Sequence, residues 1–132
     1  MKDINYIVIH CSASPQGRGD TAETIHQWHQ EREWTGIGYH FVILEDGTVE
    51  AGRPEYWDGA HARGYNDRSL GICLIGMGGD ATAEQMNALD VLVNGLADVH
   101  YEAEVVGHDY LDAIKPNCPG FNVKSWWDSH KN

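Results

Sequence analysis

Residues 70–75, with the sequence L-G-I-C-L-I, carry no polar side chain and constrain the fold more than any other segment. A strand with one face in water alternates apolar and polar residues, whereas a run that is apolar on both faces is typical of a covered central strand. Strand and helix patterns follow one another elsewhere without a linker, a repeat or a low-complexity segment. We therefore predict an α/β (α+β) fold in a single domain, residues 1–132, with a mixed central β-sheet flanked by helices.

Further segments rich in β-branched and aromatic residues predict the other strands. These segments are residues 5–10, 39–44, 48–53 and 104–107, and the last is short enough to be an edge strand. Asp46 and Gly47 favour a tight hairpin between the two middle segments. Helices are expected at residues 21–33, 83–100 and 122–129.

Capping signals predict where the first two helices begin. Asp20, with Glu23 three residues later, predicts the start of the first helix, and Thr82 with Gln85 forms a capping box for the second. Apolar residues at helical spacing then predict the buried stripe of the second helix. The stripe consists of Met86, Leu89, Leu92 or Val93, Leu96 and Val99.

Composition excludes several classes of function. The net charge is −11 with nine Lys and Arg residues, which argues against a nucleic-acid partner, because binding to phosphates requires clustered cations. No apolar run approaches the roughly 18 residues needed for a membrane span. The first residues show no long apolar region and no small-residue cleavage site, so we expect no signal peptide and synthesis in the cytoplasm. Cys11, Cys73 and Cys118 are then expected to be free thiols.

Residues 107–121, G-H-D-Y-L-D-A-I-K-P-N-C-P-G-F, bring a His, a Lys and a Cys together on one short segment. Prolines on either side of Cys118 favour a rigid loop rather than a helix or a central strand. His108 and Cys118 are metal-ligating residue types, and the Lys115 cation lies near them in sequence. This segment predicts a metal site that performs chemistry, provided that a third ligand comes from elsewhere.

His10 is a candidate for that third ligand, because it ends the predicted strand 5–10 and rigid strands project functional side chains at their ends. With His108 and Cys118 it would form a three-ligand zinc site whose fourth position is open to water, as in catalytic zinc centres. Zinc lowers the pKa of bound water to about 7. Lys115 is placed to stabilise an oxyanion on a carbonyl under attack. The residues alone leave packed or surface histidines as the alternative.

A series of sequence blocks extends along nearly the whole chain. In order, they are I-V-I-H-C-S-A-S at 7–14, W-H at 28–29, G-I-G-Y-H-F-V-I at 36–43, D-G-T-V-E-A-G-R at 46–53, A-H-A-R-G-Y-N at 60–66, S-L-G-I-C-L-I-G at 69–76, T-A-E-Q-M at 82–86, G-H at 107–108 and K-P-N-C-P-G-F at 115–121. Together these blocks resemble the zinc-dependent N-acetylmuramoyl-L-alanine amidases of the small phage lysozyme type. This is the second amidase family, which is related to peptidoglycan recognition proteins.

The resemblance implies a peptidoglycan-recognition-protein-like amidase fold with one Zn²⁺ per chain. The residues that match family positions are His10, His108 and Cys118 as zinc ligands, Tyr39 and Lys115 as catalytic residues, and His61 near the substrate groove. Many relatives carry a Glu in the strand where this chain has Cys73. A carboxylate base is therefore not expected, and Tyr39 is the group expected to orient or deprotonate the attacking water.

Other histidines and cysteines are interpreted as structural. His26 and His29 lie three apart on one helix and favour packing or exposure over a metal pair. His40 should point to the face opposite Tyr39, and Cys11 to the face opposite His10, because neighbouring strand residues alternate.

The resemblance implies an endolysin that hydrolyses the bond between N-acetylmuramic acid and L-alanine in peptidoglycan. Such an enzyme acts on the cell wall after another protein opens the inner membrane. The alternatives are a cytoplasmic cell-wall recycling amidase and a peptidoglycan-binding module without activity. A phage RNA polymerase that the protein binds and inhibits is a further possible partner implied by the resemblance. We expect a monomer.

Overall fold

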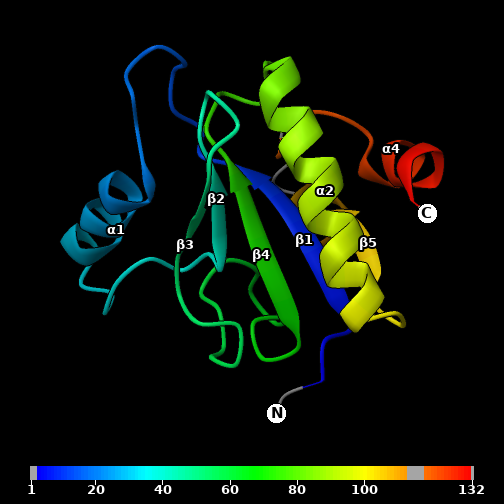
Figure 1. The fold of residues 1–132 in the computed structure, drawn as a ribbon. Helices are drawn as coiled ribbons and strands as arrows, with labels where there is room; N and C mark the ends of the chain where they lie inside the picture. Colours follow the sequence, from blue (N-terminus) through cyan, green and yellow to red (C-terminus); the bar gives the residue numbers. More distant parts are fainter. Residues whose placement is uncertain (1–2, 113–117, 132) are drawn as a thin grey trace.

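The computed structural model describes residues 3–112 and 118–131, and its centre is a five-stranded sheet in the order β3-β2-β4-β1-β5 (Figure 1). The strands are β1 (Tyr6–Cys11), β2 (Phe41–Ile43), β3 (Val49–Ala51), β4 (Ser69–Leu74) and β5 (Glu104–Gly107). The pairs β1–β4, β1–β5 and β2–β4 are parallel, whereas β3 pairs antiparallel with β2. The predicted mixed sheet is confirmed, and β4, at its centre, is buried along its whole length.

Helices cover both faces of this sheet. They are α1 (Ala22–Glu31), α2 (Ala83–Val99), the short α3 (His108–Leu111) and α4 (Val123–His130). Figure 1 shows α2 crossing one face, with α4 beyond β5 and α1 beyond β3. Among residues 3–112 and 118–131, none of these helices is both long enough and apolar enough to span a membrane.

Two apolar clusters separate the faces of the sheet. On one face, Leu89 and Val93 of α2 pack in a cluster with Ile72 of β4. On the other, Ile25 of α1 shares a cluster with Cys73 of β4. The odd-numbered positions of β1, Ile7 and Ile9, belong to the α2 cluster, so its even-numbered positions face away from α2. His10 therefore points to the face on which Cys73 lies.

The start of α1 differs from the prediction. Its N-cap is Thr21, whose side chain accepts a hydrogen bond from the Thr24 backbone N–H, while the Thr24 hydroxyl accepts from the Thr21 N–H. The expected cap, Asp20, is instead held by Arg18 at 2.9 Å. The prediction that Glu23 completes the capping box is wrong as well, because Thr21 and Thr24 satisfy the backbone N–H groups at the start of the helix.

The capping box of α2 is confirmed, whereas one member of its predicted stripe is wrong. Thr82 and Gln85 cap each other as expected. Val99 is 69% exposed, because ten residues at 100° each place it about 80° away from Leu89 around the helix. Gln85 takes a buried place instead, and its Nε2 donates to the backbone oxygens of Ile43 and Ile75.

Candidate metal centre

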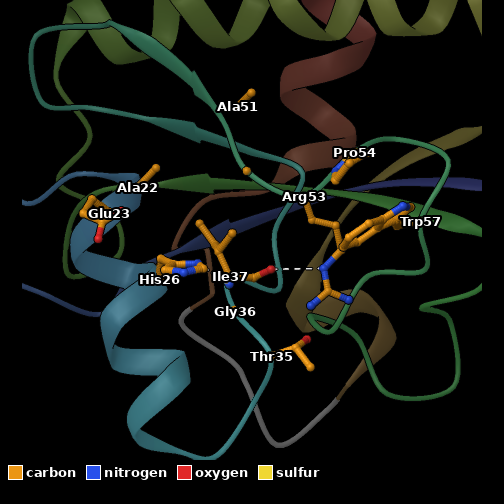
Figure 2. Close-up of a pocket in the computed structure, with 11 residues that line it drawn as sticks. Ala22, Glu23, His26, Thr35, Gly36, Ile37, Ala51, Arg53, Pro54 and Trp57 are labelled. Atoms are coloured by element: carbon orange, nitrogen blue, oxygen red, sulfur yellow. Dashed lines mark hydrogen bonds between the residues drawn. The ribbon is translucent and has the colours of Figure 1, made fainter.

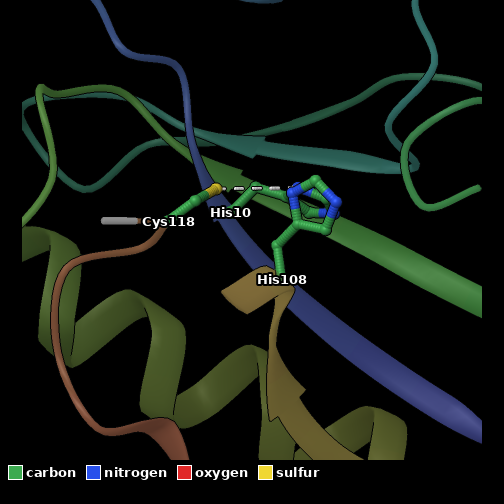
Figure 3. A group of neighbouring side chains, drawn as sticks. All are labelled: His10, His108 and Cys118. Atoms are coloured by element: carbon green, nitrogen blue, oxygen red, sulfur yellow. Dashed lines mark hydrogen bonds between the residues drawn. The ribbon is translucent and has the colours of Figure 1, made fainter. Parts of the chain in front are cut away.

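His10, His108 and Cys118 lie together on the sheet face opposite α2 (Figure 3). Each offers one ligand atom, and the three atoms lie within 4.8 Å of one another. His10 Nδ1 is 3.9 Å from Cys118 Sγ, and the imidazole centroids of His10 and His108 are 4.4 Å apart. Within residues 3–112 and 118–131, this is the group of His, Cys and acidic side chains whose geometry suits a metal ion.

Parallel pairing explains how residues so far apart in sequence meet. β1 and β5 are neighbours in register, with Ile9 opposite Gly107. The next residue of each chain segment is a histidine, so His10 and His108 leave adjacent strands at the same edge of the sheet. Cys118 returns to this edge, where its sulfur accepts a hydrogen bond from the Cys11 backbone N–H at 3.4 Å.

The donor set suits a zinc ion in chemistry and in spacing. Two imidazole nitrogens and a thiolate are borderline-soft ligands that leave one tetrahedral position for water. Tetrahedral bonds of about 2.0 Å to nitrogen and about 2.3 Å to sulfur would separate these two ligand atoms by about 3.5 Å. The observed separation of 3.9 Å between His10 Nδ1 and Cys118 Sγ is close to that value.

His10 is held in the protonation state that a metal ligand needs. Its side chain is 1% exposed. Burial is the main cause that lowers its pKa, and the charges of His61 and His108 lower it further. The imidazole is therefore neutral at pH 7 and keeps a lone pair on one nitrogen.

Tyr39 lies beside this cluster. Its ring centroid is 5.0 Å from that of His10, and its hydroxyl forms a hydrogen bond with the Cys73 thiol. Desolvation, followed by the thiols of Cys73, Cys118 and Cys11, raises the pKa of Tyr39 well above its ordinary value. Its hydroxyl therefore carries its proton at neutral pH and can orient a water molecule, whereas deprotonating one would require a phenolate.

Cys11 and Cys73 are both buried, as expected, but both also contact the surroundings of the cluster. Cys73 bonds to the Tyr39 hydroxyl, and the Cys11 thiol is hydrogen-bonded to the Cys118 thiol. Because neighbouring strand residues alternate, Cys11 was predicted to point away from the face on which His10 lies. The sequence carried no signal for the contact, since Cys118 approaches from a loop that passes the end of β1.

The segment before Tyr39 is fixed by two histidines of α1. The backbone N–H of Ile37 donates to His26 Nδ1 at 3.1 Å, and that of Gly38 donates to His29 Nδ1 at 3.0 Å. His26 and His29 thus have a structural role in this fold. His40 is also structural: it is 1% exposed, and its Nδ1 accepts a hydrogen bond from the Gly71 N–H.

The hydrogen bond to His29 predicts a loss of stability in acid. Burial, with smaller contributions from Arg32, Arg53 and His26, lowers the pKa of His29 from 6.5 to about 4. His29 is therefore protonated below about pH 6.5 in the unfolded chain but only below about pH 4 in the folded chain. The free energy of unfolding keeps its full value above about pH 6.5 and decreases by up to about 3 kcal/mol as the pH falls to about 4.

The measurement is urea unfolding at several pH values for the unchanged protein and for His29→Asn. The Asn oxygen can accept from the Gly38 N–H but does not titrate. We expect the unfolding free energy of the variant to fall less steeply between pH 6.5 and 4. Parallel curves for the two proteins over this range would contradict the assignment.

Two predicted site residues remain, His61 and Lys115. His61, expected near the substrate, has its Nδ1 at 2.9 Å from His10 Nε2 and its Nε2 at 3.1 Å from Ser69 Oγ. It therefore lies behind a candidate ligand. Lys115 lies outside the described residues, so its catalytic role stays a prediction.

A pocket of about 460 Å³ lies next to the segment that precedes Tyr39 (Figure 2). Glu23 and His26 of α1 form one wall, and Arg53 and Trp57 another. The Arg53 Nε donates to the Ile37 oxygen at 3.0 Å, which links Arg53 to the segment that precedes Tyr39. Trp57 is 53% exposed, so part of its indole ring is open to solvent.

Comparison with known proteins identifies the family of this chain. A family model described as N-acetylmuramoyl-L-alanine amidase matches residues 1–121. The endolysin of Escherichia phage T7 is 41% identical over 133 residues, which cover 95% of this chain and 86% of that protein. The N-acetylmuramoyl-L-alanine amidase LysC from Clostridium intestinale superposes with a TM-score of 0.84 at 32% identity, covering 97% of this chain and 85% of that one. Drosophila PGRP-LB superposes with a TM-score of 0.82 at 29% identity, covering 100% and 85%.

By its fold and by these comparisons, the chain falls in the class of peptidoglycan amidases and peptidoglycan recognition proteins, as the sequence blocks predicted. The chain belongs to the N-acetylmuramoyl-L-alanine amidase family. It is an enzyme that hydrolyses the amide bond between N-acetylmuramic acid and L-alanine in peptidoglycan.

Proposed function

We propose that the protein is a zinc-dependent endolysin that opens the bacterial cell wall for host lysis. The proposal that the enzyme depends on zinc is supported by the positions of His10, His108 and Cys118, whose ligand atoms lie within 4.8 Å of one another. The lysis role is supported by likeness to phage endolysins over nearly the full length of the chain.

In the proposed mechanism, His10, His108 and Cys118 would hold the zinc ion. Bound there, it would supply Lewis-acid chemistry, which acidifies water and polarises a carbonyl group. The Tyr39 hydroxyl orients the attacking water, consistent with its position beside His10 and with its raised pKa. Lys115, assigned from the sequence, stabilises the oxyanion that forms on the carbonyl. The pocket lined by Arg53 and Trp57 accommodates a part of the substrate next to the cleaved bond.

The test combines metal content with product release. Purified protein should contain about one zinc per chain and release peptides that begin with L-alanine from peptidoglycan. A chelator should abolish release, and added zinc should restore it. Protein with stoichiometric zinc that releases no such peptide would refute the proposal.

Lysis and recycling differ in the preferred substrate. An endolysin should solubilise intact sacculi and clear cells whose inner membrane has been permeabilised. A recycling amidase would act on soluble muropeptides and leave sacculi intact. Activity on soluble fragments alone would favour the recycling enzyme.

Binding to a phage RNA polymerase and the monomeric state stay predictions. A pull-down with purified polymerase, together with a transcription assay, tests the first, and sedimentation tests the second. Unchanged transcription at excess protein would exclude the polymerase as a partner.

Tyr39→Phe should separate water orientation from metal binding. The variant loses only the hydroxyl, so we expect kcat to fall by about 10²-fold or more with about one zinc per chain retained. Peptide release under single-turnover conditions, with metal analysis of the same sample, measures both. An unchanged kcat would exclude Tyr39 from the mechanism.

A further inference from the structure

We infer that His61 is a positioning residue for the metal centre: it fixes the ring orientation and the tautomer of His10 and does not serve chiefly to bind substrate. The inference rests on the zinc centre proposed above. Its basis is a chain of two hydrogen bonds behind His10, together with two glycines that make room for the His61 ring.

The hydrogen bonds run in one direction. His10 faces Cys118 with its Nδ1, so a neutral His10 that ligates through this atom must carry its proton on Nε2. That nitrogen is 2.9 Å from His61 Nδ1, which must therefore accept. The His61 proton then lies on Nε2, at 3.1 Å from the hydroxyl oxygen of Ser69. Each nitrogen thus has a defined role that agrees with metal binding by His10.

Two glycines, Gly71 in β4 and Gly59, leave space for the His61 side chain. A Cβ on Gly71, in the middle of β4, would lie 2.6 Å from the Cγ of His61. A Cβ on Gly59 would overlap with the Cδ2 of His61. Glycine weakens the interior of a strand and marks close approach of another group. At β4 the group that approaches is the His61 imidazole.

The backbone of His61 is fixed as well. The N–H groups of His61 and Ala62 both donate to Asn66 Oδ1 at 2.9 Å. Ser69, at the outer end of the chain of hydrogen bonds, is fully buried. His61 is therefore held by its loop, by the sheet and by Ser69, as expected for a residue that orients a ligand. Outer partners of this kind typically change metal affinity by about 10- to 100-fold.

The experiment compares His61→Leu with His61→Asn. Leu fills a similar volume without an acceptor, whereas the Asn oxygen occupies about the position of Nδ1. Zinc affinity is measured by competition with a chromogenic chelator, and the geometry of the centre by the visible absorption of the Co²⁺-substituted protein. Thermal unfolding of the metal-free forms controls for loss of fold.

We expect His61→Leu to weaken zinc binding by about 10- to 100-fold and to alter the Co²⁺ spectrum, with His61→Asn close to the unchanged protein. Equal zinc affinities and spectra for all three proteins would overturn the inference. A raised KM for peptidoglycan with unchanged zinc affinity would also overturn it, in favour of substrate contact. An unchanged protein that binds no zinc would instead refute the proposed function.

Discussion

His108→Ala should abolish zinc binding and lower the amidase rate by about a thousandfold or more. The side chain supplies one of three ligand atoms that lie within 4.8 Å of one another, and two remaining ligands would not hold a catalytic zinc ion in its usual geometry. A metal ion contributes several kcal/mol to the stabilisation of the transition state. Each 1.36 kcal/mol corresponds to about tenfold in rate. Metal analysis and peptide release from sacculi measure the two losses.

His130→Ala is the matched control. This substitution also removes an imidazole, but from an exposed position near the end of α4. We expect its zinc content and rate to equal those of the unchanged protein. If His108→Ala kept one zinc per chain and full activity, the three-ligand centre would be wrong.

Leu89→Ala should cause a large loss of stability without a matching loss of chemistry. Leu89 lies on α2, is fully buried and belongs to the cluster that joins α2 to the sheet. Truncating such a side chain typically costs about 2–5 kcal/mol, from lost transfer energy and from the cavity that remains. For a chain of this size, about 4 °C in Tm corresponds to each 1 kcal/mol. Calorimetry should therefore show Tm lower by about 8–20 °C.

Val91→Ala is the control on the same helix. Val91 is 76% exposed, so its truncation should change the unfolding free energy by no more than about 0.5 kcal/mol. Because the candidate centre lies on the opposite face of the sheet, kcat of Leu89→Ala at low temperature should stay near that of the unchanged protein. A Tm shift for Leu89→Ala no larger than that for Val91→Ala would contradict the packing of α2 on the sheet.

Much of the fold could be predicted because local signals agreed with the tertiary structure. The segment 70–75 was apolar on both faces, and β4 is the buried central strand. The capping box of Thr82 and Gln85 correctly predicted the residue at which α2 begins. The Asp46–Gly47 turn joins β2 and β3 as an antiparallel pair. In each case a few neighbouring residues determine the structure.

The geometry of the site could not be predicted from local sequence patterns in the same way. The sequence identified His10, His108 and Cys118 as candidates, but their meeting depends on β1 pairing with β5, which no local pattern specifies. The bond between His61 and His10 joins residues 51 positions apart. Gly59 and Gly71 make room for the His61 ring, but a glycine in a sequence does not show which group approaches it. The Thr21–Thr24 box was missed because an equally good cap, Asp20, precedes it.

The position of β1 between β4 and β5 has a consequence for synthesis on the ribosome. β1 emerges first among the strands, yet both of its hydrogen-bonding neighbours are encoded much later. Contacts of such long sequence separation form slowly, because a long loop must close before they stabilise the chain. His10 and Cys118 are 108 positions apart, so the nascent chain has no complete candidate metal centre until Cys118 has been translated. Metal binding at the proposed centre, and the hydrolysis that would depend on it, therefore requires that the nascent chain extend past Cys118.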